Sequence, residues 1–320
     1  MTERKLSLAE LEQNPSICVF DNREETVASY TVIIPTYKRP AMLRFALESG
    51  LNQESFSDYE VLVLDNNPER NDGTEQLMQT YAAERRIAYY KNVENIGGVG
   101  NWNKLTIMAR TDWVVMLHDD DMLYPDFFCV LQQSREKVPN ADCIYSSCQQ
   151  AHFSDGTLQP RQKVRSTIYP LKQKDFVMSN VAGPLVGMAY KRQVLIKLGG
   201  FNLDYAPLSD YYFHALLAQS FHSYKMLGYP TTCYRWFEND TGNPQIMKAI
   251  QEMGTIIKRE LLAKHKFLLS TGLARGYFKV IQKRPFTLWD KCCSYLTIQY
   301  FRIPWKLRVR LCSMKVVDHI

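Results

Sequence analysis

The chain has 320 residues, of which 46% are hydrophobic and 22% are charged, and its formal net charge is +6. This composition predicts a folded protein with a large core and excludes a disordered chain. Because the sequence has no uninterrupted apolar run of about 18 residues and its N-terminal segment MTERKLSLAELEQN is charged, we expect neither a membrane-spanning helix nor a signal peptide, and therefore a cytoplasmic protein.

The predicted elements alternate between strands and helices. Ser7 and Glu10 have the spacing of a capping box, which predicts a short helix within an N-terminal extension of residues 1–29. From Tyr30 onward, short apolar runs typical of buried strands alternate with helical stripes, and Pro40 stands near the start of the first stripe. The expected strands are residues 30–35, 59–67, 87–92 and 112–119, and the expected helices are residues 39–53, 74–84 and 100–110. Since these strands are continuously apolar, they predict an α/β domain with a mainly parallel sheet.

Polar segments follow each of these strands. They read PTYKR, DNNPERNDG, NVENIGGVGN and HDDD in chain order. In open α/β sheets ligands bind beyond the carboxyl ends of the strands, so four such ends predict a site for a polar, phosphorylated ligand. The sequence lacks a G-x-x-x-x-G-K-[ST] loop, and NIGGVGN lacks the spacing of the dinucleotide fingerprint, so neither cofactor class is favoured.

Six motifs occur in the order and spacing seen in glycosyltransferase family 2. They are TVIIPTYKR, VLVLDNN, NIGGVGNWN, WVVMLHDDDMLYPDF, GMAYKRQVLIKLGGFN and LSDYYFHALLA. The resemblance covers Tyr30 to Asn243 and implies an inverting, nucleotide-sugar-dependent enzyme of the Rossmann-like GT-A fold. We therefore expect a catalytic domain at residues 30–245 and a C-terminal helical extension at residues 246–320.

The acidic triplet after the fourth strand is where the resemblance implies a metal site. Matched to the family's D-x-D pattern, Asp120 is the metal carboxylate, Asp119 lies near the ribose or the metal, and Asp121 orients the loop. His118 takes the place of the usual first acid. A divalent cation such as Mn²⁺ or Mg²⁺ suits these hard oxygen ligands and the charge of a departing diphosphate. The alternative is that the carboxylates only favour the N-terminus of a helix beginning near Pro125.

The resemblance also implies a set of donor-binding residues. Pro35, Thr36 and Tyr37 are expected to border the base, Arg39 to reach phosphate, and Asp65 to accept a hydrogen bond from a uracil imide. Asn95 and Asn103 flank a turn in which glycines let the backbone approach the ligand, namely Gly97, Gly98 and Gly100. Ordinary turn chemistry, and for Asp65 a plain strand-end acid, remain the alternatives.

The base of an inverting transfer is expected at Asp210, where the family carries a Glu-Asp pair and this chain has Ser209 first. A carboxylate there can take the proton of an acceptor hydroxyl, although simple capping of a helix is the alternative. His214 is expected to be structural. Gly183 and Gly187 are expected to form a floor facing the transferred sugar. Tyr234 and Arg235 are candidates for the diphosphate, and because Phe237 stands where the family has a histidine, Asn239, Asp240 or water would replace that ligand.

The C-terminal tail carries most of the basic character. Between Arg275 and Lys315 there are ten Lys or Arg residues against one acid, Asp290. The last segment, PWKLRVRLCSMKVV, has two apolar stripes separated by cations, so one stripe could dock on the domain while the other meets an anionic membrane surface. A solvated basic face is the alternative, and no nucleic-acid-binding module accompanies the tail.

Together these features predict a glycosyltransferase that moves a sugar from a UDP-sugar to a saccharide acceptor. By analogy the acceptor is lipid-linked and belongs to surface-polysaccharide assembly, with the enzyme peripheral on the inner face of the cell membrane and no nucleic acid as partner. One rival is a sugar nucleotidyltransferase, which would need a glycine-rich triphosphate loop that is not found. The other is a non-catalytic nucleotide-sugar binding module.

Overall fold

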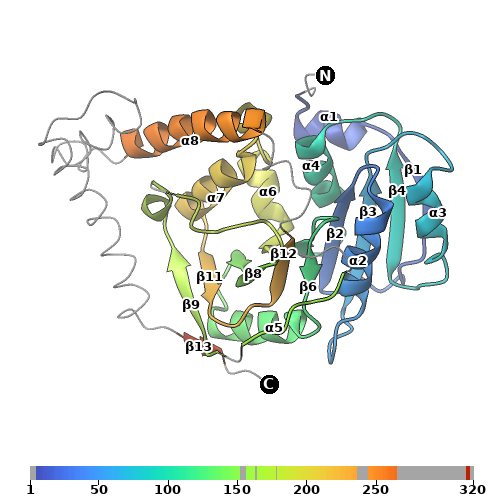
Figure 1. The fold of residues 1–320 in the computed structure, drawn as a ribbon, viewed down its shortest axis with the longest axis horizontal. Coiled ribbons are helices and arrows are strands. Elements are labelled where there is room, and N and C mark those ends of the chain that lie inside the picture. Colours follow the sequence, from blue (N-terminus) through green and yellow to red (C-terminus); the bar gives the residue numbers. More distant parts are fainter. Residues whose placement is uncertain are drawn as a thin grey trace, which may run out of the picture.

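The computed structural model describes residues 5–151, 156–162, 164–177, 179–235, 244–264 and 315–317. Its centre is a ten-stranded sheet with the strand order β1-β4-β3-β2-β5-β10-β7-β11-β9-β13 (Figure 1). The strands of this sheet are β1 (Ser16–Asp21), β2 (Tyr30–Thr36), β3 (Tyr59–Asp65), β4 (Ile87–Asn92), β5 (Trp113–Met116), β7 (Cys143–Tyr145), β9 (Ser166–Leu171), β10 (Ala189–Lys191), β11 (Ser223–Leu227) and β13 (Lys315–Val317).

The sheet has a parallel half and a mixed half. Strands β4, β3, β2 and β5 are parallel neighbours, in agreement with the prediction for residues 30–119. Beyond β5 the expectation of a mainly parallel sheet fails, because β10 runs antiparallel to both β5 and β7, and β9 runs antiparallel to β11. The N-terminal extension also contributes, since β1 joins the sheet as an antiparallel edge strand beside β4.

The helices begin where local sequence signals place them. They are α1 (Leu8–Gln13), α2 (Pro40–Leu51), α3 (Gly73–Gln79), α4 (Gly98–Met108), α5 (Phe127–Lys137), α6 (Arg192–Leu198), α7 (Ser209–Ser220) and α8 (Pro244–Lys264), with short 3₁₀ turns at Gln173–Phe176 and Leu203–Tyr205. The predicted capping box forms at α1, where the Ser7 N–H donates to Glu10 over 2.8 Å and the Glu10 N–H donates to Ser7 Oγ over 3.3 Å. Pro40 occupies the first turn of α2, where its missing N–H costs nothing.

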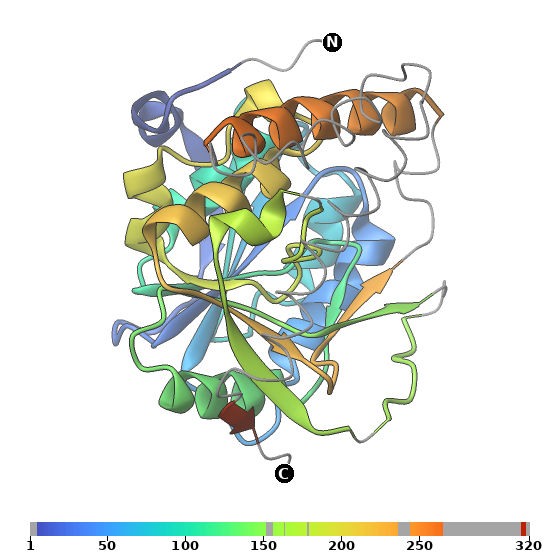
Figure 2. The same ribbon diagram turned by 90° about the vertical axis from the view of Figure 1, so that its left-hand side faces the viewer.

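Both faces of the sheet are buried, which explains why its strands are apolar throughout. Successive residues of a strand point to opposite faces, so Ile33 packs with α4, α6, α7 and α8 while Val32 and Ile34 pack with α2, α3 and α5. Figure 2 shows α7 and α8 on one side of the sheet and α5 on the other.

A second, three-stranded sheet lies beside the carboxyl end of β5. It consists of β6 (Met122–Leu123), β12 (Thr232–Arg235) and β8 (Cys148–Ala151), with β12 in the middle. Since β6 directly follows the acidic triplet, pairing with β12 fixes where the triplet's loop ends.

The C-terminal region is helical over α8, as predicted, and α8 packs on the core through Ile257, Leu261 and Leu262. None of the helices in the described ranges is long and apolar enough to cross a membrane. The cations from Arg275 to Arg310 lie outside the described residues, and only Lys315–Val317 is seen again, pairing with β9.

Candidate active site

A polar cavity of about 410 Å³ lies at the carboxyl ends of the parallel strands. It is formed by the end of β2, the loop after β3, the start of α4 and the loop after β5. Eight of the predicted donor and metal residues line it, namely Pro35, Thr36, Tyr37, Arg39, Asn95, Gly97, Asp119 and Asp120. His118 and Gly98 also line it, together with three residues that the sequence did not single out, which are Asn66, Asn101 and Trp102. The polar segments that follow the strands therefore do meet around one cavity, as the sequence predicted.

Asp119 is the most constrained carboxylate of the cavity. It is buried, and its Oδ2 accepts a hydrogen bond of 2.8 Å from Thr36 Oγ1. Burial, followed by the neighbouring charge of Asp120, raises the pKa of Asp119 to about 7, and the interactions with Thr36 and Arg39 oppose this rise. Arg39 reaches both carboxylates, with Nη1 at 3.8 Å from Asp119 and 3.3 Å from Asp120. The guanidinium therefore offsets part of the repulsion within the triplet.

Three side chains of this loop form a cluster that fits a cation. A ring nitrogen of His118 and carboxylate oxygens of Asp120 and Asp121 all lie within 4.8 Å of one another. Within the described part of the chain, His118 Nε2 and Asp121 Oδ2 are buried without a hydrogen-bond partner. Buried polar atoms are normally paired, so two orphaned acceptors in one cluster fit a bound metal ion. The His118 ring is held by stacking on Trp102, with ring centroids 5.1 Å apart.

Arg235 supports the acidic loop through hydrogen bonds and does not line the cavity. Its guanidinium Nε donates to the Asp120 carbonyl over 2.6 Å, and its backbone N–H donates to Asp121 Oδ1 over 3.1 Å. The side chain is buried and lies over the ring of Phe45. In this structure the guanidinium is engaged by backbone carbonyls, and contact with a donor diphosphate stays a prediction.

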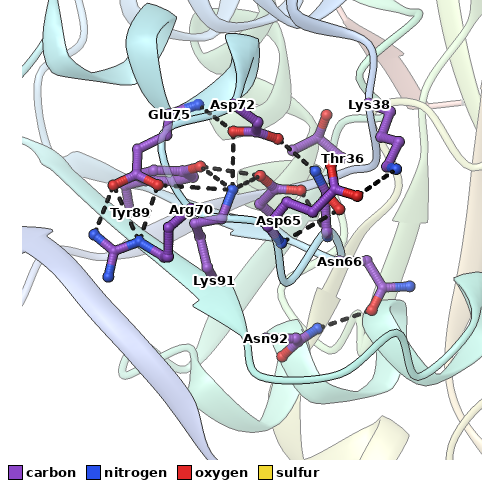
Figure 3. Close-up of polar contacts among 12 residues, drawn as sticks. Thr36, Lys38, Asp65, Asn66, Arg70, Asp72, Glu75, Tyr89, Lys91 and Asn92 are labelled. Carbon is purple, nitrogen blue, oxygen red and sulfur yellow. Dashed lines mark hydrogen bonds and ion pairs between the residues drawn. The ribbon is translucent and has the colours of Figure 1, made fainter.

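Asp65 does not line the cavity either. Its carboxylate is fully buried and accepts hydrogen bonds from Lys91 Nζ at 2.8 Å, from the Tyr89 hydroxyl at 3.0 Å and from the Asn67 N–H at 2.9 Å (Figure 3). Lys91 also pairs with Asp72 at 3.0 Å. The carboxylate predicted to read a uracil imide is therefore engaged by a buried lysine. The sequence did not indicate this partner, because Lys91 lies on the neighbouring strand β4, which none of the six motifs includes.

Asparagine side chains form the wall beside α4. Asn66 Nδ2 donates to Asn95 Oδ1 over 2.8 Å, and Asn92 Nδ2 donates to Asn66 Oδ1 over 3.1 Å and to Asn101 Oδ1 over 3.0 Å. Buried Lys104 of α4 donates to Asn92 Oδ1 over 2.8 Å, and burial lowers the pKa of Lys104 to about 8. This chain of amides fixes the wall of the cavity.

Two other predicted residues act on the protein and not on the cavity. Asn103 clamps the backbone of Phe201, donating to its carbonyl over 2.9 Å and accepting from its N–H over 2.8 Å. Gly187 has φ +69°, and a Cβ there would lie 2.3 Å from Thr232 Cγ2 and 2.9 Å from Phe127. Gly187 is therefore small because the two sheets meet there, and the predicted approach to a sugar is not what its position requires. Gly183 has φ +82° and lies near Lys225 Nζ, 3.6 Å from the position of a Cβ.

Asp210 stands in the first turn of α7, partly buried, and Leu208 is the N-cap of that helix without any side-chain cap bond. Asp210 is therefore not the N-cap residue, although its carboxylate accepts hydrogen bonds from backbone N–H groups of the first turn. Burial raises the pKa of Asp210 to about 6, while the backbone N–H groups of Tyr211 and of Asp210 itself oppose the shift. Ser209 is buried and donates to the Asn202 carbonyl over 2.9 Å.

Tyr234 on β12 interacts electrostatically with both the acidic loop and Asp210. Burial, followed by the charges of Asp121, Asp120 and Asp210, raises the pKa of its hydroxyl to about 12. Both carboxylate groups are therefore within electrostatic reach of one side chain. Phe237, which stands where the family has a histidine, lies outside the described residues, as do Asn239 and Asp240, the side chains proposed to replace that ligand.

Comparison with known proteins agrees with this geometry. Residues 31–199, more than half of the chain, match the profile described as "Glycosyl transferase family 2". An uncharacterized glycosyltransferase of Haemophilus influenzae is 27% identical over 198 residues, covering 61% of this chain and 65% of that protein. The GalNAc(5)-diNAcBac-PP-undecaprenol beta-1,3-glucosyltransferase of Campylobacter jejuni is 26% identical over 214 residues, covering 66% of each. The chain thus aligns with slightly less than two thirds of either relative.

The fold matches that of TarS from S. aureus, residues 1–349, with a TM-score of 0.54 at 16% identity, over 85% of this chain and 80% of that one. The likeness at this identity is one of fold, and the fold is that of GT-A glycosyltransferases.

The buried pair of Asp65 and Lys91 yields a stability prediction. Lys91→Met keeps the length of the side chain but leaves the buried Asp65 without its cation, so it should lower the free energy of unfolding by about 3–5 kcal/mol. The matched control is Lys38→Met, because Lys38 pairs with Glu69 over 3.3 Å at the exposed surface and should cost under about 1 kcal/mol. Urea unfolding measures both. Equal small losses would mean that Lys91 does not hold this edge of the sheet.

Proposed function

The chain belongs to glycosyltransferase family 2, and from this premise we propose that it transfers a hexose from a UDP-sugar to a saccharide acceptor with inversion at the anomeric carbon. The observation that carries the proposal is the polar cavity at the carboxyl ends of β2, β3 and β5, whose edge holds the acidic loop. A nucleotide sugar is a polar, anionic ligand of a size that a cavity of about 410 Å³ accommodates in part.

The donor is proposed to bind along the cavity with its base near Tyr37 and its diphosphate near Arg39. Tyr37 is 44% exposed at the cavity wall, and Lys38 Nζ lies over its ring at 5.6 Å from the centroid, so an aromatic surface with a cation beside it is available to a nucleotide. Arg39 supplies a cation that both lines the cavity and reaches the carboxylates of the acidic loop. TarS, which has a similar fold, has been determined in complex with UDP and with UDP-GlcNAc. This supports a uridine nucleotide as the first ligand to test.

A divalent cation, Mn²⁺ or Mg²⁺, is proposed at the cluster of His118, Asp120 and Asp121. When bound, such an ion stabilises the negative charge that a diphosphate leaving group develops. The two orphaned buried acceptors of this cluster support the fit. Compared with the sequence prediction, in which Asp120 alone was the metal carboxylate, the proposed ligand set gains a histidine and a second acid.

Asp210 is proposed to be the general base. The acceptor hydroxyl oxygen forms the new bond to the anomeric carbon as the bond from that carbon to the diphosphate oxygen breaks, and the diphosphate leaves with the bonding electrons. Asp210 takes the hydroxyl proton, so it must be ionised beforehand. A raised pKa of about 6 keeps the carboxylate ionised at neutral pH and makes it a better proton acceptor than an exposed aspartate.

The acceptor is proposed to be a lipid-linked saccharide at an anionic membrane surface. The name of the Campylobacter jejuni relative specifies glucosyl transfer to a diphospho-undecaprenol-linked saccharide. The ten cations between Arg275 and Lys315 supply charge of the sign that anionic lipid attracts.

The metal site predicts a metal-dependent interaction with UDP. Wild-type protein should be stabilised against heat by UDP more strongly with Mn²⁺ than without it. Asp120→Ala should abolish the metal-dependent part and lower turnover about a hundredfold or more, and His118→Ala should weaken it. The control is Asp204→Ala, whose carboxylate is exposed and pairs with Lys5. Thermal unfolding with a panel of nucleotide sugars also identifies the donor. A normal metal response in Asp120→Ala would refute the proposed ligand set.

The base predicts a pH profile. Asp210→Asn keeps the shape of the side chain but cannot take a proton, so turnover should fall about two orders of magnitude or more while UDP binding stays unchanged. In wild type, kcat/KM should rise with pH through about 6 as Asp210 ionises and should fall about tenfold per pH unit below it. This limb should be missing from the residual activity of Asp210→Asn. Full turnover by a folded Asp210→Asn protein that still binds UDP would show that Asp210 is not the base. Any turnover also distinguishes the enzyme from a non-catalytic module, which would bind UDP and turn over nothing.

The basic tail predicts salt-sensitive membrane binding. Each of Arg302, Lys306, Arg308 and Arg310 should contribute on the order of 1 kcal/mol near an anionic bilayer. Changing all four to Gln should release the protein from anionic vesicles in co-sedimentation, with transfer to a short soluble acceptor retained. Equal binding of both proteins to neutral and anionic vesicles would show that these cations are not the anchor.

A further inference from the structure

Asp210 is connected to a partly buried chain of polar side chains that the proposed reaction has not yet used. Asn180 Nδ2 donates to Asp210 Oδ2 over 3.3 Å and to the Gly183 carbonyl over 3.2 Å. On its other side, Asn180 Oδ1 lies 3.2 Å from Nδ1 of His214, which is fully buried one turn along α7 from Asp210. Three side chains from two segments are therefore connected in sequence from His214 to Asp210.

The chemistry of these groups fixes the direction of every hydrogen bond. A backbone carbonyl only accepts, so the atom of Asn180 facing Gly183 must be the amide nitrogen, and Oδ1 must face His214. Asn180 Oδ1 also only accepts, so His214 must carry its proton on Nδ1. This leaves Nε2 without a proton and without a partner, and Nε2 of His214 is indeed buried with no hydrogen-bond partner within the described residues.

The surroundings keep His214 neutral and immobile. Burial, followed by the charge of Lys225, lowers the pKa of His214 to about 3. The ring meets the edge of Tyr145 at 70°, with centroids 4.9 Å apart. Lys225 itself is turned away into the carbonyls of Ser146 and Ala182 at 2.7 and 2.6 Å. A neutral imidazole has one N–H, which the geometry gives to Asn180.

We propose that Asn180 and His214 are positioning residues for Asp210: His214 orients the Asn180 amide, and the amide holds the Asp210 carboxylate ionised and in place. The proposal rests on Asp210 being the base. Tyr145 on β7 and Tyr234 on β12 also interact with Asp210, and both are neutral phenols at pH 7, since burial raises their pKa values further above the ordinary value of about 10. Asn180 is thus the side-chain donor to this carboxylate among the described residues, beside the backbone N–H groups of α7.

The first test is the tautomer of His214, which needs no substrate. A long-range ¹H–¹⁵N correlation spectrum of protein labelled in its six histidines reports which ring nitrogen carries the proton, and His214→Asn identifies the signal. We expect a neutral ring protonated on Nδ1 from about pH 5 to pH 8. Protonation on Nε2, or titration near the ordinary value of about 6.5, would overturn the proposal.

The second test is the titration of the Asp210 carboxyl carbon, followed by ¹³C NMR in aspartate-labelled protein and assigned with Asp210→Asn. Asn180→Ala should raise its midpoint by about one pH unit, a tenfold change, because a hydrogen bond to the charged form is lost. His214→Leu should raise it similarly. His214→Asn should not, since its amide nitrogen can stand where Nδ1 was. Gln219→Ala is the control, because it removes the 2.6 Å bond to Gln173 from the exposed far end of the same helix and should leave the midpoint unchanged.

The outcomes separate this inference from the proposed function. An unchanged midpoint in a folded Asn180→Ala protein would overturn the positioning role even if Asp210→Asn were inactive. Retained turnover in Asp210→Asn would instead remove the base and with it the catalytic meaning of the chain. If both proposals hold, the acid limb of the kcat/KM profile in Asn180→Ala moves up by the same one unit as the NMR midpoint.

Discussion

Negative charge at the carboxyl edge of the parallel strands is the constraint on which the rest of this site depends. Strand β3 ends in Asp65 and the loop after β5 carries Asp119, Asp120 and Asp121, all at an edge that burial partly removes from water. Like charges in such a place repel and are costly to desolvate, so each needs a defined partner. The two groups of carboxylates differ in how completely they are paired, and this difference indicates where the site lies.

The carboxylates around β3 are closed off. Asp65, Asp72 and Glu75 surround the buried ammonium of Lys91, and Arg70 adds a second cation to Glu75 at 2.6 Å (Figure 3). The triplet after β5 is left open. Arg39 and Arg235 reach its outer oxygens and its backbone, yet one oxygen of Asp121 and one nitrogen of His118 stay without a partner in the described structure. In the described structure, polar atoms of the triplet's loop lack a partner, whereas the carboxylates around Lys91 are paired. This difference supports the triplet, and not Asp65, as the place for a ligand or cation.

Sequence pattern predicted the parallel half of the fold and most of the cavity, for a physical reason. Strands buried on both faces are continuously apolar, and ligands meet the residues that follow them, so Thr36, Asn95 and Asp119 could be found without coordinates. The mixed half was not predicted because β7 and β10 have three residues each, too few for a periodicity. The partners of Asp65, Asn103 and Arg235 were not predicted because Lys91, Phe201 and the Asp120 carbonyl are distant in sequence, and only the tertiary fold decides whether a polar side chain faces ligand or protein.

Strand β12 links the two parts of the proposed active site. The acidic loop follows β5 of the parallel half, while Asp210 belongs to α7, which packs in a core cluster that includes strands of both halves. Strand β12 connects them. Its Arg235 side chain donates a hydrogen bond to the backbone carbonyl of Asp120 in the loop, and the charges of both Asp121 and Asp210 raise the pKa of the preceding residue, Tyr234. Since neighbouring residues of a strand point to opposite sides, one strand can brace the loop with one side chain and present the next toward the space between the two carboxylate groups. In the proposed reaction, the three-stranded sheet therefore fixes the spacing between the bound donor and Asp210, which an in-line displacement requires.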